Sequence, residues 1–216
     1  MSSADFSIEL SERANDDLSA LLSSHLHDVR QDKDITRLKL NNFVHRCDQP
    51  SFIVIKTLLL GDSRPWRSIK FADIVQGNEY RRWLYKKESL CRRIVTLEDE
   101  LGIAIKFNTR LEVTFESMSK ESIVDLLETV RQDSDITTLS FSGSINLEDV
   151  EDIYNALSKL MRHEPGRKWD GIIFHVSYTG GSADYTMWHN TIRKYCLRLE
   201  KLSAECSIPV GFKMIN

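Results

Sequence analysis

The stretch Gly171-Ile-Ile-Phe-His-Val-Ser-Tyr178 is apolar at nearly every position, which is typical of a strand buried on both faces of a sheet. Helical patterns flank it over residues 147–162 and 186–205, and shorter apolar runs lie at 136–141 and 208–214. Strand, helix, strand, helix and strand at this spacing predict two right-handed crossovers between parallel strands. The C-terminal part of the chain is therefore predicted to be a βαβαβ unit.

Towards the N-terminus the pattern is less regular. Residues 119–131 are predicted to be helical, and the alternation over 103–115 predicts an antiparallel strand pair or one bent strand. Residues 52–60 are β-branched and apolar, which predicts a strand, whereas 69–75 and 80–95 are predicted to be a short and a longer helix. The fold class expected for the whole chain is α+β to α/β.

These patterns divide the chain into three parts. Residues 1–34 are predicted to form an acidic amphipathic helical arm, 35–117 a basic part of strands and helices, and 118–216 the α/β part, unless all three form one continuous domain. No internal repeat or low-complexity tract is apparent. The N-terminal helix either packs on the domain or docks on another protein.

Composition excludes several classes of protein. The 216 residues are 41% hydrophobic and 28% charged, which suits a chain that buries a core. The four cysteines show neither a CxxC pair nor zinc-ligand spacing, so we expect free thiols in a reducing compartment. No run approaches the ~20 apolar residues of a membrane span, and no secretory leader is apparent. We expect an intracellular, cytoplasmic and peripherally membrane-associated protein, neither secreted nor transmembrane.

The net charge of −3 conceals a strong segregation of charge. Residues 64–93 carry nine bases against three acids, interleaved with aromatic residues, whereas 94–155 carry fourteen acids against four bases. Such a basic aromatic segment either binds an anionic membrane or nucleic acid, or is a solvated helix paired with acidic segments of the same chain. The residues expected to bind an anionic surface are Arg64, Arg67, Lys70, Arg81, Arg82, Trp83, Lys86, Lys87, Arg92 and Arg93.

A second candidate is the turn Gly180-Gly181-Ser182 between the buried strand and the following helix. It is either a tight strand-to-helix turn or a cradle whose N–H groups hold an anion. The six histidines are scattered, and no nucleophile adjoins a recognisable base. We therefore expect no catalytic residue, metal site or cofactor, and a protein that is not an enzyme.

Residues 51–75 carry one family resemblance. Phe52-Ile-Val-Ile-Lys-Thr-Leu is followed by Arg64-Pro-Trp-Arg67 and then by the apolar positions of 69–75. This order resembles the opening of the folded core of rhabdovirus matrix proteins. The resemblance implies a viral structural protein that self-associates and binds the inner membrane leaflet or a nucleocapsid and its RNA through the basic segment.

The C-terminal third carries another resemblance. Ser142-Gly-Ser-Ile145, Gly180-Gly181-Ser182 and Ile208-Pro-Val210 resemble the core unit of the Clp protease and crotonase folds. That likeness implies an oxyanion hole at the N–H groups of Gly180 and Gly181. No serine follows the strand at 208–214, where the protease has its nucleophile. The alternative function is thus an α/β domain without a catalytic serine that binds a small anionic ligand or a protein partner.

Overall fold

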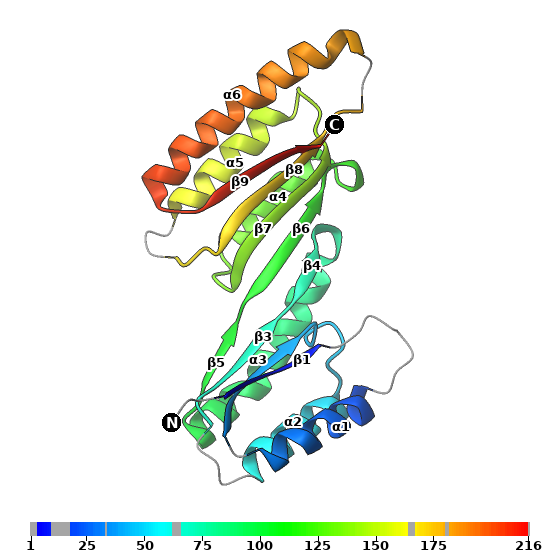
Figure 1. The fold of residues 1–216 in the computed structure, drawn as a ribbon, viewed down its shortest axis with the longest axis vertical. Coiled ribbons are helices and arrows are strands. Elements are labelled where there is room, and N and C mark those ends of the chain that lie inside the picture. The colour runs from blue at the N-terminus through cyan, green and yellow to red at the C-terminus, as the bar shows by residue number, and fades with distance from the viewer. Residues whose placement is uncertain are drawn as a thin grey trace. The chain divides into compact units, whose positions relative to one another are not determined.

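The computed structural model describes residues 4–9, 18–32, 34–61, 66–163, 167–179 and 182–215 (Figure 1). The chain forms two compact units. Unit 1 comprises Met1–Ile74 and Arg81–Asn108, and unit 2 comprises Val75–Tyr80 and Thr109–Asn216. The mixed α/β class expected from the sequence is confirmed. The division between the units lies at residues 108 and 109, whereas the sequence patterns placed it near 117.

Unit 1 is a parallel sheet with three helical crossovers. Its strands follow the order β1-β2-β3-β5, and every neighbouring pair is parallel. The elements in chain order are β1 (Ala4–Glu9), α1 (Leu18–Gln31), β2 (Ile35–Asn41), α2 (Gln49–Leu60), β3 (Ser68–Ala72), α3 (Tyr80–Leu101) and β5 (Ala104–Phe107).

Unit 2 repeats this plan. Its sheet has the order β4-β6-β7-β8-β9, and the strands from β6 to β9 are parallel neighbours. Its elements are β4 (Ile74–Gln76), the 3-10 turn Gly77–Glu79, β6 (Thr109–Thr114), the 3-10 turn Phe115–Ser117, α4 (Lys120–Val130), β7 (Ile136–Ser144), α5 (Val150–His163), β8 (Gly171–Ser177), α6 (Ser182–Cys206) and β9 (Val210–Ile215).

The strand order leaves one face of each sheet open. Because neighbouring strands follow one another along the chain and such crossovers are right-handed, the three helices of a unit cover the same face. In Figure 1, α5 and α6 lie side by side against the sheet of unit 2. The strands alternate accordingly: in β2, Leu38 and Leu40 are buried, whereas Lys39 between them is exposed.

The two units are copies of one sequence as well as of one topology. Val29-Arg-Gln-Asp-Lys-Asp-Ile-Thr-Arg-Leu38 and Val130-Arg-Gln-Asp-Ser-Asp-Ile-Thr-Thr-Leu139 are identical at eight of ten positions, 101 residues apart. A second series lies 105 residues apart and runs from the third helix into the last strand. Its identical pairs are Tyr80 and Tyr185, Trp83 and Trp188, Cys91 and Cys196, Arg93 and Arg198, Leu97 and Leu202, Glu100 and Glu205, Ile103 and Ile208, and Phe107 and Phe212. The expectation that the chain has no internal repeat is wrong.

Backbone geometry and packing follow the same correspondence. The residues with positive φ in the described part form two equivalent pairs, Asn42 with Gly143 near the end of the second strand and Gly102 with Ser207 after the third helix. Equivalent phenylalanines of the third and fourth strands stack at 5.1 Å between ring centroids in both units. These pairs are Phe71–Phe107 and Phe174–Phe212.

Several expected elements need correction in unit 1. Residues 52–60 lie in α2, not in a strand, because Asp48 accepts a hydrogen bond from the N–H of Ser51 as an N-cap and Pro50 occupies the first helical turn. Residues 69–75 contribute to β3 and β4 instead of a helix. The supposed N-terminal arm is part of the sheet, since β1 pairs with β2 and α1 buries Leu22, Leu26 and Val29.

The later expectations are met more closely. Over 103–115 the chain forms β5 and β6, which belong to different sheets and are not an antiparallel pair. The helix expected at 119–131 is α4, with Ser119 as its N-cap, and the strands expected at 136–141, 171–178 and 208–214 are β7, β8 and β9. These last three strands are parallel, as predicted.

Candidate anion-binding face

Three lysines lie side by side on the open face of the unit 1 sheet. Lys39 of β2 pairs in register with Lys70 of β3, and Lys70 pairs with Lys106 of β5. Adjacent strands lie about 4.8 Å apart, so the three side chains form a row across the sheet. Arg37, two residues before Lys39 and exposed on the same face, extends the row. We call Arg37, Lys39, Lys70 and Lys106 the lysine face.

Local sequence dictates this arrangement. Each lysine sits between two apolar neighbours, in Leu38-Lys-Leu40, Ile69-Lys-Phe71 and Ile105-Lys-Phe107. Because successive side chains of a strand point to opposite faces, the apolar neighbours enter the core and the lysine faces outward. Lys39 and Lys106 are exposed and Lys70 is half-buried. The parallel register then aligns three separate segments of the chain.

The electrostatics of this row point to an external partner. Lys39, Lys70 and Lys106 make no ion pair or hydrogen bond within the described part of the chain. Like charges directly opposite one another destabilise a sheet, so the row costs stability in isolation. The fold does not require it, because the equivalent positions of unit 2 are Ser140, Ile173 and Gly211.

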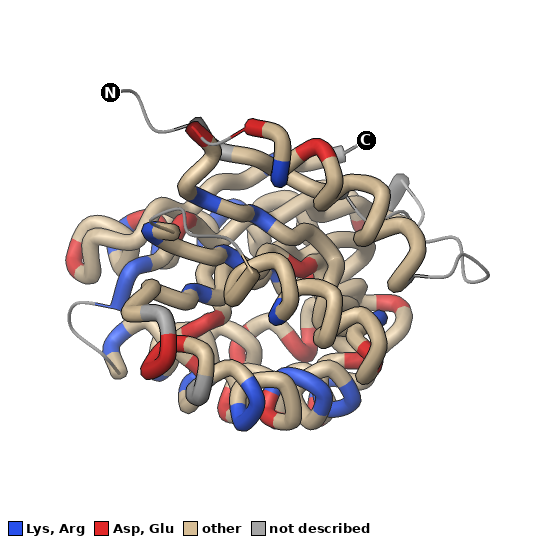
Figure 2. The backbone as a smooth tube through the Cα atoms, turned by 90° about the horizontal axis from the view of Figure 1, so that it is seen from below, with Lys and Arg blue, Asp and Glu red and all other residues tan. Residues whose placement is uncertain are grey.

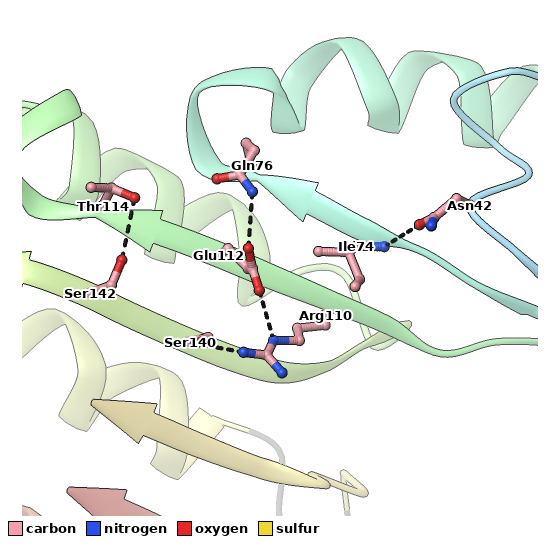
Figure 3. Close-up of polar contacts among 8 residues, drawn as sticks. All are labelled: Asn42, Ile74, Gln76, Arg110, Glu112, Thr114, Ser140 and Ser142. Atoms are coloured by element: carbon pink, nitrogen blue, oxygen red, sulfur yellow. Dashed lines mark hydrogen bonds and ion pairs between the residues drawn. The ribbon is translucent and has the colours of Figure 1, made fainter. Parts of the chain in front are cut away.

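On the open face of unit 2, polar side chains of β4, β6 and β7 pair with one another (Figure 3). Gln76 donates to the Glu112 carboxylate at 3.0 Å, and Glu112 forms an ion pair with Arg110 at 3.1 Å. Arg110 also donates to Ser140, and the hydroxyls of Thr114 and Ser142 lie 3.4 Å apart. This part of the face therefore presents hydroxyls and a neutral ion pair, and beyond it Lys213 of β9 pairs in register with His175 of β8.

Two members of the expected anion-binding segment are in the core. Trp83 is fully buried, and its indole N–H donates to the Asp73 carboxylate at 2.8 Å. Lys87 is 7% exposed, and its ammonium group lies over the rings of Trp83 and Phe107 at 5.3 and 5.7 Å. Neither side chain can reach an anionic surface, which corrects the expectation for these two residues.

The other expected residues are dispersed. Arg64 lies outside the described residues, and Lys70 belongs to the lysine face. Lys86 donates to the carbonyl of His45, and Arg93 lies over the ring of Phe52 at 5.8 Å. The exposed remainder comprises Arg67, Arg81, Arg82 and Arg92. The segment thus comprises β3, β4 and the first part of α3, whose inner side is buried, and Figure 2 shows basic and acidic positions interspersed along the helices.

The predicted anion turn lies mostly outside the described residues. Gly180 and Gly181 lie outside the described residues, and Ser182 begins α6. In unit 2, a hollow of about 630 Å³ lies at the carboxyl ends of β6, β7 and β8, where open parallel sheets usually bind ligands. Its described charged lining consists of Glu116, Glu148 and Asp184. This negative lining is unfavourable for an anionic ligand.

Other classes of site find no support in the described residues. No group of three histidines, cysteines, aspartates or glutamates there is arranged to hold a metal ion. None of the helices in the described ranges combines the length and apolar character that a bilayer crossing requires. Comparison with family models, curated proteins and solved structures found no match to this chain.

Sequence reasoning singled out Lys70 but missed Arg37, Lys39 and Lys106. The lysines are 31 and 36 residues apart along the chain, so no window of sequence contains them together. A usable signal exists nonetheless: a lysine between two apolar residues occurs four times, at Lys39, Lys70, Lys106 and Lys213, and the first three of these lie in unit 1. If the three runs of unit 1 are recognised as neighbouring parallel strands, Lys39, Lys70 and Lys106 are predicted to lie side by side.

Proposed function

We propose that this protein is a non-enzymatic assembly protein that binds an anionic surface through the lysine face of unit 1. The observation that carries the proposal is the row Lys39, Lys70 and Lys106, unpaired in the described part of the chain and replaced at the equivalent positions of unit 2 by Ser140, Ile173 and Gly211. An anionic partner would relieve the mutual repulsion of the lysines and release its own counterions.

The partner chemistry fits two surfaces that a matrix-like protein meets: the anionic inner leaflet of a membrane, and the RNA of a nucleocapsid. No aromatic residue accompanies the lysines on this face among the described side chains, whose other members are Ser7, Asn41, Ser68, Ala72 and Ala104. Without rings to stack on bases, binding would depend on phosphate charge and not on base sequence. The four free thiols suit the cytoplasmic, membrane-peripheral location that this function implies.

The test is co-sedimentation with phosphatidylserine vesicles and with single-stranded RNA, each at low and high salt. The variant Lys39→Ser/Lys70→Ser/Lys106→Ser should lose salt-dependent binding. The matched control, Arg81→Ser/Arg82→Ser/Arg92→Ser, removes the same charge from exposed positions of α3 and should retain it. If only the control variant lost binding, the binding site would lie in the segment 64–93 and the proposed lysine face would be refuted.

A further inference from the structure

Helix α4 of unit 2 carries an acidic stripe on its outer surface. Glu121, Asp125 and Glu128 are exposed at positions i, i+4 and i+7, so they lie along one side of the helix. The opposite side buries Ile123, Leu126, Leu127 and Val130 against the unit. Glu121 and Asp125 have no ion pair in the described part of the chain, and Glu128 pairs with Arg131. We call Glu121, Asp125 and Glu128 the acidic stripe.

The spacing of the acidic stripe matches the spacing of the lysine face. At a rise of 1.5 Å per residue, the three acids are separated by about 6 and about 4.5 Å along the helix axis. The three lysines are separated by about 4.8 Å from strand to strand. A helix laid across the strands would therefore set each carboxylate opposite one ammonium group.

The internal repeat shows that these two charged surfaces are not required by the fold. With Leu22, Leu26 and Val29 aligned to Ile123, Leu127 and Val130, the helix positions equivalent to the acidic stripe are Ala20, Ser24 and His27. Unit 1 thus has the lysines without the acids. Unit 2 has the acids without the lysines, because its sheet carries Ser140, Ile173 and Gly211.

We infer that the lysine face of one copy docks on the acidic stripe of a second copy of this chain. The inference rests on the proposed function, because it uses the same lysine face and names its protein partner. Such a contact joins two different surfaces, so one copy can engage two others and the copies can follow one another from head to tail. RNA or an anionic membrane would compete for the lysines and take such an assembly apart.

The first experiment measures mass by sedimentation velocity at about 50 mM and about 500 mM salt. The native protein should form concentration-dependent oligomers that dissociate at high salt, since exposed charge pairs are screened. Glu121→Gln/Asp125→Asn/Glu128→Gln should remain monomeric at low salt. The control Asp99→Asn/Glu100→Gln/Glu148→Gln removes the same charge from other exposed positions and should still associate.

A charge-reversal pair makes the test independent of folding defects. Lys39→Glu/Lys70→Glu/Lys106→Glu and Glu121→Lys/Asp125→Lys/Glu128→Lys should each be monomeric alone, with native circular dichroism. Mixed together, they should associate, because each variant then meets a complementary surface on the other. Failure of the mixture to associate, with both variants folded, would overturn the inference.

RNA co-sedimentation in parallel separates this inference from the proposed function. A protein that binds RNA through the lysines but stays monomeric at low salt retains the function and refutes the contact between copies. Oligomers that persist in the acidic-stripe variant refute the contact as well. If the lysine variant keeps both RNA binding and oligomers, the function and the contact both fall.

Discussion

Two equivalent tryptophans differ in whether their indole N–H donates a hydrogen bond. Trp83 donates to Asp73, and the same carboxylate accepts hydrogen bonds from the backbone N–H groups of Phe43 and Val44. Burial nevertheless raises the pKa of Asp73, despite these bonds. Trp188 occupies the equivalent place in unit 2, and its buried indole nitrogen has no hydrogen-bond partner among the described residues. Counted from the stacked phenylalanine, the position of Asp73 is taken by Val176.

This difference predicts unequal costs for one substitution. Trp83→Phe should lower the free energy of unfolding by about 1–3 kcal/mol more than Trp188→Phe, because it deprives a buried carboxylate of a donor. Both variants lose the same ring volume, so the comparison isolates the hydrogen bond. Urea unfolding followed by circular dichroism measures both, and equal losses would contradict the assigned role of Asp73.

A surface carboxylate sets the pH dependence of another contact. Glu151 of α5 accepts hydrogen bonds from Arg198 and Tyr195 of α6, and these hold its pKa at about 2, below the usual 4.5. Because the folded-state pKa is depressed, the contact stabilises the fold above about pH 4.5 and is lost as the pH falls towards 2.

Glu151→Gln should therefore flatten the loss of thermal stability between pH 4.5 and 2, as followed by melting temperature across a pH series. Glu148→Gln, at an exposed position without an ion pair in the described part of the chain, serves as the control and should keep the native slope. An unchanged slope in Glu151→Gln would argue against the contact between α5 and α6.

At the scale of elements, the residues that follow α3 and α6 are equivalent but differ in type, so each can be replaced by the other type of residue. Gly102 follows α3 with φ of 63°, and Ser207 follows α6 with φ of 57°. A side chain in this left-handed region is strained, whereas glycine adopts it freely. Ser207→Gly should stabilise the protein by about 0.5–1 kcal/mol and Gly102→Ser should destabilise it by a similar amount. Chemical denaturation measures both, and shifts of the same sign would refute the assignment.

Two elements of unit 1 also show why composition and apolar spacing predicted the wrong secondary structure. The run Phe52-Ile-Val-Ile favours a strand by composition, but Asp48 and Pro50 mark a helix start, and α2 buries Phe52, Ile55 and Leu58 on its inner side. The helix predicted over 69–75 is wrong because Ile69 and Phe71 are buried at a spacing of two, which is the spacing of a strand and is observed in β3. Regular amphipathic segments of unit 2 were predictable because each spans several helical turns.

For the whole molecule, the repeat was hidden by divergence between its two conserved runs. The first run repeats at an interval of 101 residues and the second at 105, and the segments between them keep burial but little identity. The topology restores the alignment. The candidate site cannot be predicted from any single stretch of sequence, because parallel pairing assembles it from β2, β3 and β5.

The salt dependence of RNA binding gives a prediction at the same scale. Neutralising Z phosphates of a single strand gives a slope of about −0.7Z in log affinity against log salt concentration. The lysine variant Lys39→Ser/Lys70→Ser/Lys106→Ser should therefore reduce the magnitude of the slope by about 2. Fluorescence anisotropy over a salt series measures it. An unchanged slope would mean that these lysines do not contact phosphate.

Only the sheet of unit 1 carries the lysine face, and this limits the number of polyanion-binding sites per copy. Each copy has a single lysine face among the described residues, so we expect one molecule to bind a polyanion at one place. In a head-to-tail row of copies, every lysine face but the terminal one is occupied by a neighbour. Such a row keeps a valence of one for RNA or membrane whatever its length, and gains avidity only when its contacts exchange for the polyanion.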